Sequence, residues 1–167
     1  MTQEMTQEMT QKMTQQKIQV RVQSADFDLG LEVARLRAQD PGVGAVVSFV
    51  GTVRDVNDGA CVAGMELEHY PGMTEQSIQA IIDQATARWA LSGALVVHRV
   101  GPLLPMEQIV LVATAAAHRG IAFAACEFII DYLKTEAPFW KKEQTPDGAR
   151  WVDAREGDAA ALAKWSR

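Results

Sequence analysis

One segment of the chain, residues 119–136, constrains the fold more than any other, because it predicts a long helix that is apolar on two sides. One side carries Phe123, Cys126, Ile130 and Leu133, and the other carries Ala122, Ala125, Ile129 and Tyr132. A surface helix needs only one apolar side, so this helix must be covered twice, by its own sheet and by a further surface. That surface can belong to the same chain or to another one. Pro138 is expected to end the helix.

The rest of the sequence alternates between strand-like and helix-like periodicity. Residues 18–23 alternate apolar with polar side chains, whereas GAVVSFVGTVR at residues 44–54 is mostly apolar and typical of a central strand. The expected strands are 18–23, 44–54, 62–70, 94–100 and 108–115, and the expected helices are 29–39, 73–90, 119–136 and 156–165. This order predicts one α+β domain with a mostly antiparallel sheet and two main helices. Residues 55–59 are expected to form a loop, and the tail after Pro138 is assigned only a short helix.

The chain ends and the composition exclude several classes of protein. Residues 1–16 repeat MTQE-like tetrads and contain no aromatic residue, so disorder is expected there and a folded domain over residues 17–167. No signal-peptide core is visible, and no segment approaches the ~20 apolar residues that span a bilayer. A cytoplasmic protein without membrane attachment is therefore expected. The net charge of −5 argues against nucleic-acid binding.

Cationic side chains nevertheless gather at a few positions of this acidic chain. They are Arg54 at the end of a strand, His118 and Arg119 before the long helix, Lys134 near its end, and Lys141 and Lys142 beside Glu143. These positions are the first candidates for binding an anionic ligand. The two cysteines form no CxxC motif and no two histidines have ligand spacing, so neither a metal nor a cofactor is expected.

The two ends of the long helix suggest different chemistry. His118 and Arg119 lie at its start, where free N–H groups attract anions and arginine adds a bidentate donor. Lys134 lies near its end, where a desolvated lysine could transfer protons or act as a nucleophile. The alternative is that His118 only caps the helix, Arg119 is solvated, and Lys134 complements the helix dipole or extends into water.

Both ends of one helix cannot serve one small pocket. Arg119 and Lys134 are fifteen residues apart, which is roughly 22 Å along a helix at ~1.5 Å per residue. If both residues bind the same ligand, they must come from different chains. A symmetric dimer would provide that arrangement, and the second apolar side of the helix is consistent with it.

A longer block of sequence identifies a family. The segment from His118 to Glu143, HRGIAFAACEFIIDYLKTEAPFWKKE, resembles the large, catalytic subunit of molybdopterin synthase, as do GAVVSFVGTVR at 44–54 and TPDGARWVDAR at 145–155. The resemblance implies an α+β fold with a hammerhead-like β motif. It also implies sulfur transfer to cyclic pyranopterin monophosphate, which forms the dithiolene of molybdopterin. The sulfur comes from the C-terminal Gly-Gly thiocarboxylate of a small ubiquitin-like carrier subunit, in a heterotetramer built on a homodimer of large subunits.

The resemblance also implies roles for individual residues. Lys134 and Lys141 match two catalytic lysines, the first beside the thiocarboxylate and the second at the opening cyclic phosphate. The substrate-binding positions are Arg54, Thr52 and Phe49 near the strand end, Lys142 and Glu143 beside Lys141, and His118 and Arg119 from the neighbouring subunit. No metal is implied for the sulfur steps.

Two other functions remain open from the residues alone. The chain could be a non-catalytic docking module for a ubiquitin-like sulfur carrier, which would bind the carrier without forming product. It could also be a phosphate-ester enzyme unrelated to pterins, which would act without any carrier. Neither alternative accounts for the whole His118–Glu143 block.

Overall fold

A four-stranded sheet forms the centre of the protein. The structure is a computed structural model that describes residues 17–153 and 156–166, so the disorder expected for residues 1–16 lies outside the described residues. The strand order is β1 (Ile18–Gln23), β6 (Leu91–Arg99), β8 (Gln108–Ala116) and β2 (Ala45–Thr52). β1 runs parallel to β6, and the other two pairs are antiparallel.

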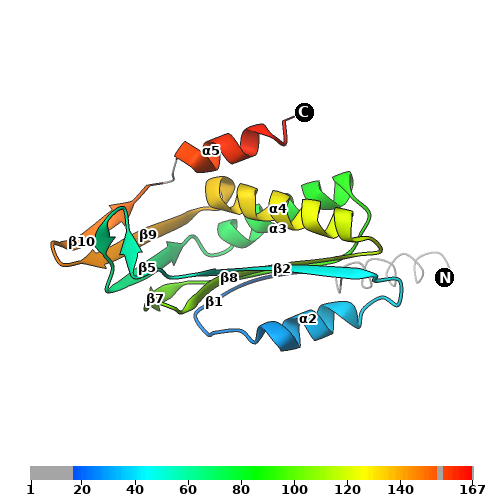
Figure 1. The fold of residues 1–167 in the computed structure, drawn as a ribbon, viewed down its shortest axis with the longest axis horizontal. Helices are drawn as coiled ribbons and strands as arrows, with labels where there is room; N and C mark the ends of the chain where they lie inside the picture. The colour runs from blue at the N-terminus through cyan, green and yellow to red at the C-terminus, as the bar shows by residue number, and fades with distance from the viewer. Residues whose placement is uncertain (1–16, 154–155, 167) are drawn as a thin grey trace.

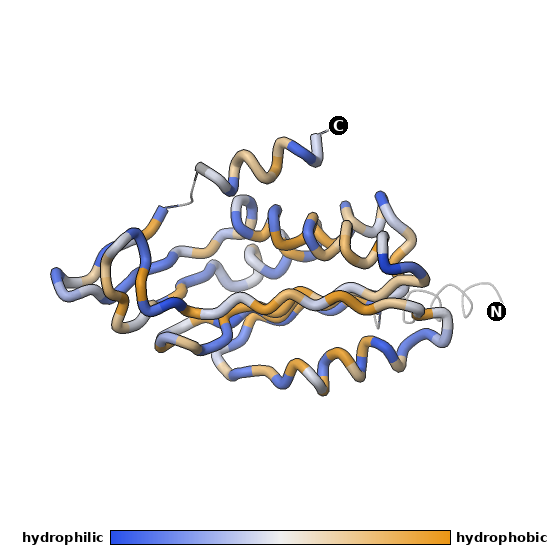
Figure 2. Tube along the Cα trace, in the orientation of Figure 1, coloured by the Kyte–Doolittle hydropathy of each residue, from blue (hydrophilic) through white to orange (hydrophobic). Residues whose placement is uncertain are grey.

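Helices cover both faces of this sheet. α3 (Met73–Arg88) and α4 (Arg119–Glu136) lie on one face, and α2 (Leu29–Arg37) lies on the other (Figure 1). The two central strands, β6 and β8, are buried along most of their length because helices cover them from both sides. Hydrophobic residues accordingly concentrate in the sheet and on the helix sides that face it (Figure 2).

The second cover of α4 comes largely from the same chain. α3 packs beside α4, and α5 (Glu156–Ala163) lies over it (Figure 1). The Phe128 ring of α4 is fully buried and meets Trp89 and Trp165 edge-on, with ring centroids 5.5 and 5.3 Å apart. Phe123, at the other end of the helix, remains 61% exposed. The described residues of one chain therefore leave part of the expected apolar side uncovered.

A second sheet extends from one end of the molecule. Its four strands are all antiparallel, in the order β10 (Gly148–Val152), β9 (Phe139–Thr145), β5 (Gly64–His69) and β7 (Gly101–Leu103). α4 ends before Pro138, and the chain continues directly into β9. This direct connection places β9 next to the C-terminal end of α4, where the pocket described below is found.

The α+β class, the mostly antiparallel pairing and the two long helices agree with the sequence analysis, but two local predictions are wrong. Residues 55–59 are not only a loop, because β3 (Val56–Asn57) and β4 (Ala60–Cys61) form a small hairpin. Asp58 and Gly59 both have positive φ, 51° and 78°, as a tight two-residue hairpin turn requires. The tail after Pro138 contains the β9–β10 hairpin, whose two-residue turn at Pro146 and Asp147 is followed by Gly148 at φ 110°.

Candidate active site

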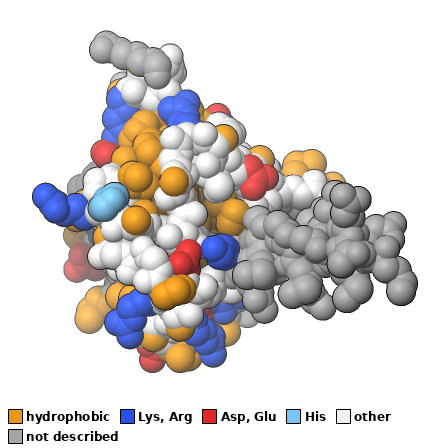
Figure 3. All heavy atoms as spheres, turned by 90° about the vertical axis from the view of Figure 1, so that its right-hand side faces the viewer, with side chains coloured by type: hydrophobic (Ala, Val, Ile, Leu, Met, Phe, Trp, Pro, Cys, Tyr) orange, Lys and Arg blue, Asp and Glu red, His pale blue; other side chains and the backbone are white. Residues whose placement is uncertain are grey.

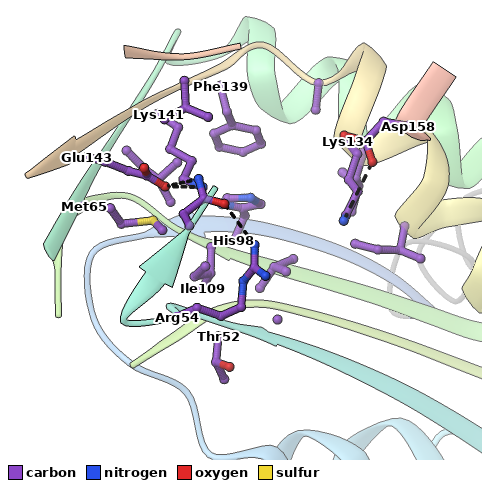
Figure 4. Close-up of a pocket in the computed structure, with 18 of the residues that line it drawn as sticks. Thr52, Arg54, Met65, His98, Ile109, Lys134, Phe139, Lys141, Glu143 and Asp158 are labelled. Carbon is purple, nitrogen blue, oxygen red and sulfur yellow. Dashed lines mark hydrogen bonds and ion pairs between the residues drawn. The ribbon is translucent and has the colours of Figure 1, made fainter. Parts of the chain in front are cut away.

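A pocket of about 360 Å³ lies where the central sheet, α4 and the second sheet meet. β2 contributes its last residues, α4 its C-terminal end, and β9 the face that is turned toward the central sheet. Figure 4 shows Lys134 on one side of this pocket, Lys141 on the other, and Arg54 between them. Three cationic side chains from distant parts of the sequence therefore share one cavity.

The carboxylate of Glu143 is the most buried charged group of the pocket, with 1% of its side chain exposed. Lys141 Nζ lies 2.9 Å from its Oε1, and Asn57 Nδ2 donates to the same oxygen at 2.8 Å. Arg150 Nη2 donates to Oε2 at 3.1 Å. Burial alone would raise the pKa of Glu143, but the hydrogen bonds from Lys141, Arg150 and Asn57 outweigh it and lower this pKa below its ordinary value. Glu143 is therefore an anion at neutral pH.

Arg54 joins this group through an amide. Its Nη2 donates to Asn57 Oδ1 at 3.1 Å, while the Nδ2 of the same amide donates to Glu143. Arg54 lies two residues beyond the end of β2, and Asn57 belongs to the β3–β4 hairpin, so the hairpin that the sequence analysis missed positions the arginine. Figure 4 shows the Arg54 guanidinium directed into the pocket.

Lys134 occupies the opposite side and has a weaker partner. Its Nζ lies 3.9 Å from Asp158 Oδ1 of α5, and 55% of its side chain is exposed. Ile130 and Leu133 precede it on α4 and line the same cavity. An exposed ion pair at this distance contributes little to stability, so the ammonium of Lys134 is available to a ligand.

His98 and Phe139 form part of the pocket wall. The two rings are stacked, with centroids 3.7 Å apart and planes 18° apart. Burial lowers the pKa of His98 to about 4, although its hydrogen bond to the carbonyl of Arg99 acts in the opposite direction. A carbonyl oxygen can only accept, so Nδ1 carries the proton of this neutral ring. His98 is not among the residues that the sequence analysis predicted for the site, and nothing in its sequence neighbourhood marks it as a pocket residue.

The structure brings together six of the nine residues predicted for the site. Phe49, Thr52, Arg54, Lys134, Lys141 and Glu143 all line the pocket. Lys142 alternates with Lys141 along β9 and lies over the Trp151 ring instead, 5.4 Å from its centroid. The pocket residues that sequence reasoning missed include Asn57, His98 and Asp158, and none of them belongs to a local motif.

His118 and Arg119 are absent from this pocket. They lie at the other end of α4, and both are exposed. Figure 3 shows that end of the molecule, where Lys, Arg and His side chains border hydrophobic ones. The separation predicted from the helix rise therefore holds within one chain, and these two residues cannot complete the pocket of their own chain.

The pocket is lined by three cations, three carboxylates and an apolar wall, and two of the carboxylates, Asp153 and Asp158, lie outside the group around Glu143. Arg54, Lys134 and Lys141 are suited to a phosphate group, and one carboxylate, Glu143, is already engaged by three donors.

Within residues 17–153 and 156–166, no group of three His, Cys, Asp or Glu side chains is placed to hold a metal ion. In the same part of the chain, none of the helices has the length and apolar character needed to cross a membrane.

Fold and pocket together define a class: α+β proteins with a cavity that brings three cationic side chains together between a mixed sheet and an antiparallel one. The model of the MoaE protein family matches residues 22–136. This chain belongs to that family, as the sequence resemblance predicted.

Known relatives are similar to this chain over most of its length. The chain is 69% identical over 144 residues to a protein of Ralstonia nicotianae named molybdopterin synthase catalytic subunit, covering 86% of this chain and 82% of the relative. The molybdopterin biosynthesis MoaE protein from Burkholderia ambifaria has a solved structure with a TM-score of 0.78 and 61% identity, covering 90% of this chain and 99% of that one. A molybdopterin synthase structure from Staphylococcus aureus has a TM-score of 0.73 and 31% identity, covering 80% and 96%.

Proposed function

We propose that this pocket transfers sulfur to cyclic pyranopterin monophosphate and so forms the dithiolene of molybdopterin. As a member of its family, the chain is an enzyme and acts as a catalytic subunit of molybdopterin synthase. The observation that carries the assignment of the pocket is the convergence of Arg54, Lys134 and Lys141 from three different elements on one cavity. His118 and Arg119 are exposed at the far end of α4, and Lys142 lies over the half-exposed Trp151 ring, outside this pocket.

The three cations have separate tasks in this reaction. Arg54 and Lys141, on the side of the pocket that contains Glu143, bind and orient the cyclic phosphate. Lys141 also stabilises the negative charge that develops on the phosphate oxygen when the ring opens. Lys134, on the opposite side, meets the thiocarboxylate as its sulfur attacks the substrate carbon, and it moves protons there. Water then cleaves the bond between this sulfur and the carrier's acyl carbon, the carrier leaves as its carboxylate, and a second carrier delivers the second sulfur in the same way. Thr52 and Phe49 contact the substrate from the end of β2.

The sulfur donor is a separate protein. Its C-terminal Gly-Gly thiocarboxylate is flexible and narrow enough to enter the pocket beside Lys134, where Ile109, Ile130 and Leu133 provide an apolar wall. Such a wall excludes water and slows hydrolysis of the thiocarboxylate. In this proposal the partner protein is a small ubiquitin-like carrier subunit.

Two copies of the chain complete each site in this proposal. His118 and Arg119 lie too far from the pocket of their own chain, so they bind the anionic substrate in the pocket of a second copy. The exposed Phe123 lies on the first turns of the same helix and supplies apolar surface for the contact. A homodimer with one carrier on each chain gives the heterotetramer.

In the same proposal, residues 17–167 of each chain form one folded domain, and the protein is located in the cytoplasm.

A single-turnover assay tests the proposed function. The purified chain is mixed with cyclic pyranopterin monophosphate and with thiocarboxylated carrier, carboxylate carrier or no carrier, and the dithiolene product is detected as its oxidised fluorescent pterin. Product is expected only with the thiocarboxylated carrier. Carrier binding without product would indicate a docking module, and turnover without any carrier would indicate an unrelated phosphate-ester enzyme.

A further inference from the structure

Glu143 was predicted to bind substrate, yet it is a buried anion in a pocket for an anionic molecule. Its side chain is 1% exposed, and both of its oxygens already accept hydrogen bonds from the protein. We propose that Asn57 and Arg150 are positioning residues, which act through the carboxylate of Glu143 to hold Lys141 and Arg54 ready for the phosphate. This inference rests on the proposed function, because it concerns the binding of the same substrate.

Asn57 links the carboxylate to Arg54. Its amide nitrogen donates to Glu143 Oε1 at 2.8 Å, and its amide oxygen accepts from Arg54 Nη2 at 3.1 Å. The residue is 3% exposed, so these contacts form away from bulk water. Only a group that donates on one side and accepts on the other can join an anion to a cation in this order, and an asparagine amide has that property.

Arg150 holds the other oxygen of the same carboxylate from outside the pocket. It lies directly opposite Glu143 in the β9–β10 hairpin, and it is absent from the pocket lining. Its Nη2 donates to Glu143 Oε2 at 3.1 Å and to the backbone carbonyl of Asn57 at 3.2 Å. Arg150 therefore fixes both the carboxylate and the hairpin that carries Asn57, without reaching the substrate itself.

The consequence for the pocket is a fixed pair of cations. Lysine and arginine side chains have many rotamers, and binding a ligand to free ones costs conformational entropy each time. Because Glu143 Oε1 holds Lys141 at 2.9 Å and Asn57 holds Arg54, that ordering is already present before the phosphate arrives. Loss of Arg150 leaves Oε2 without its donor, so the carboxylate is held only through Oε1 and fixes Lys141 less firmly.

Arg150→Met is the decisive variant, and Arg150→Lys is its conservative counterpart, which keeps a cation. Arg35→Met is the matched control, because Arg35 is an exposed arginine of α2 on the opposite face of the central sheet. Asn57→Ser tests the second arm with a small polar residue. Each variant is measured for its thermal transition, for binding of inorganic phosphate by calorimetry, and for KM and kcat with thiocarboxylated carrier.

Arg150→Met and Asn57→Ser are expected to raise the phosphate Kd and the substrate KM about tenfold. Arg150→Lys should recover most of the lost affinity, and the Kd and KM of Arg35→Met should equal those of the wild type. Unchanged Kd and KM in both Arg150→Met and Asn57→Ser, with only a lower thermal transition, would overturn the inference, because a merely structural role predicts that result. If Arg150→Met does not fold, an unchanged Kd and KM in Asn57→Ser overturn it. The two hypotheses can fail separately. If the wild type never forms product but the variants still bind phosphate more weakly, the proposed function is contradicted and the positioning role stands.

Discussion

Acid should destabilise the folded protein through one buried histidine. Burial lowers the pKa of His98 to about 4, against about 6.5 for an unfolded chain. Between these two values the unfolded state binds a proton that the folded state does not, so stability falls as the pH falls through this range. The contribution of His98 amounts to about 2 kcal/mol between pH 7.5 and pH 5, and to about 3 kcal/mol once the pH is below both values.

His98→Phe isolates this effect. A phenyl ring keeps the stacking on Phe139 but has no titrating group, and it loses the hydrogen bond to the carbonyl of Arg99 at every pH. Urea unfolding followed by tryptophan fluorescence at pH 7.5 and pH 5, at fixed protein concentration, gives the free energy of unfolding for both proteins. Carboxylates titrate alike in the two and cancel in the comparison. The wild type should lose about 2 kcal/mol more than His98→Phe over this interval. An equal loss in both proteins would refute the reasoning.

Three further predictions concern the core, the pocket and the assembly. Phe128→Ala removes a fully buried ring that contacts Trp89 and Trp165, and it should lower the free energy of unfolding by about 3–5 kcal/mol in urea titrations. Asp158→Asn should change that free energy by less than about 1 kcal/mol, because its ion pair with Lys134 is long and partly exposed. Arg119→Ala and Lys134→Ala should each be inactive alone, but co-refolded mixtures should regain about a quarter of wild-type turnover, since half of the dimers then contain one intact site of two. Mixtures that stay inactive would exclude a site shared between chains.

The parts of the fold that could be predicted are those with strong local patterns. The helix 119–136 is apolar at helical spacing and is stopped by Pro138, and the central strands are β-branched and apolar, so their positions follow from the sequence. The β9 segment, FWKKEQT, contains consecutive charges that hide its alternation, and β3 and β4 have two residues each. Their signals were the turn residues, Asp58-Gly59 and Pro146-Asp147-Gly148, rather than the strands themselves.

The candidate site also has a part that could be predicted from the sequence and a part that could not. The cations were conspicuous on an acidic chain, and helix geometry alone separated Arg119 from Lys134. Asn57 and Arg150 could not be found, because their contacts join positions far apart in sequence: 86 residues separate Asn57 from Glu143, and 93 separate Asn57 from Arg150. Lys142 was grouped with Lys141 by adjacency, whereas alternation along a strand places neighbouring side chains on opposite faces.

The most direct test of the central claim is single-turnover sulfur transfer by Lys134→Ala, with thiocarboxylated carrier and cyclic pyranopterin monophosphate. Lys17→Ala is the matched control, because Lys17 pairs with Asp40 and does not line the pocket. The account predicts that Lys134→Ala keeps its fold and its carrier binding but forms no molybdopterin, while Lys17→Ala matches the wild type. Wild-type turnover by Lys134→Ala would contradict the claim that this pocket carries out the chemistry.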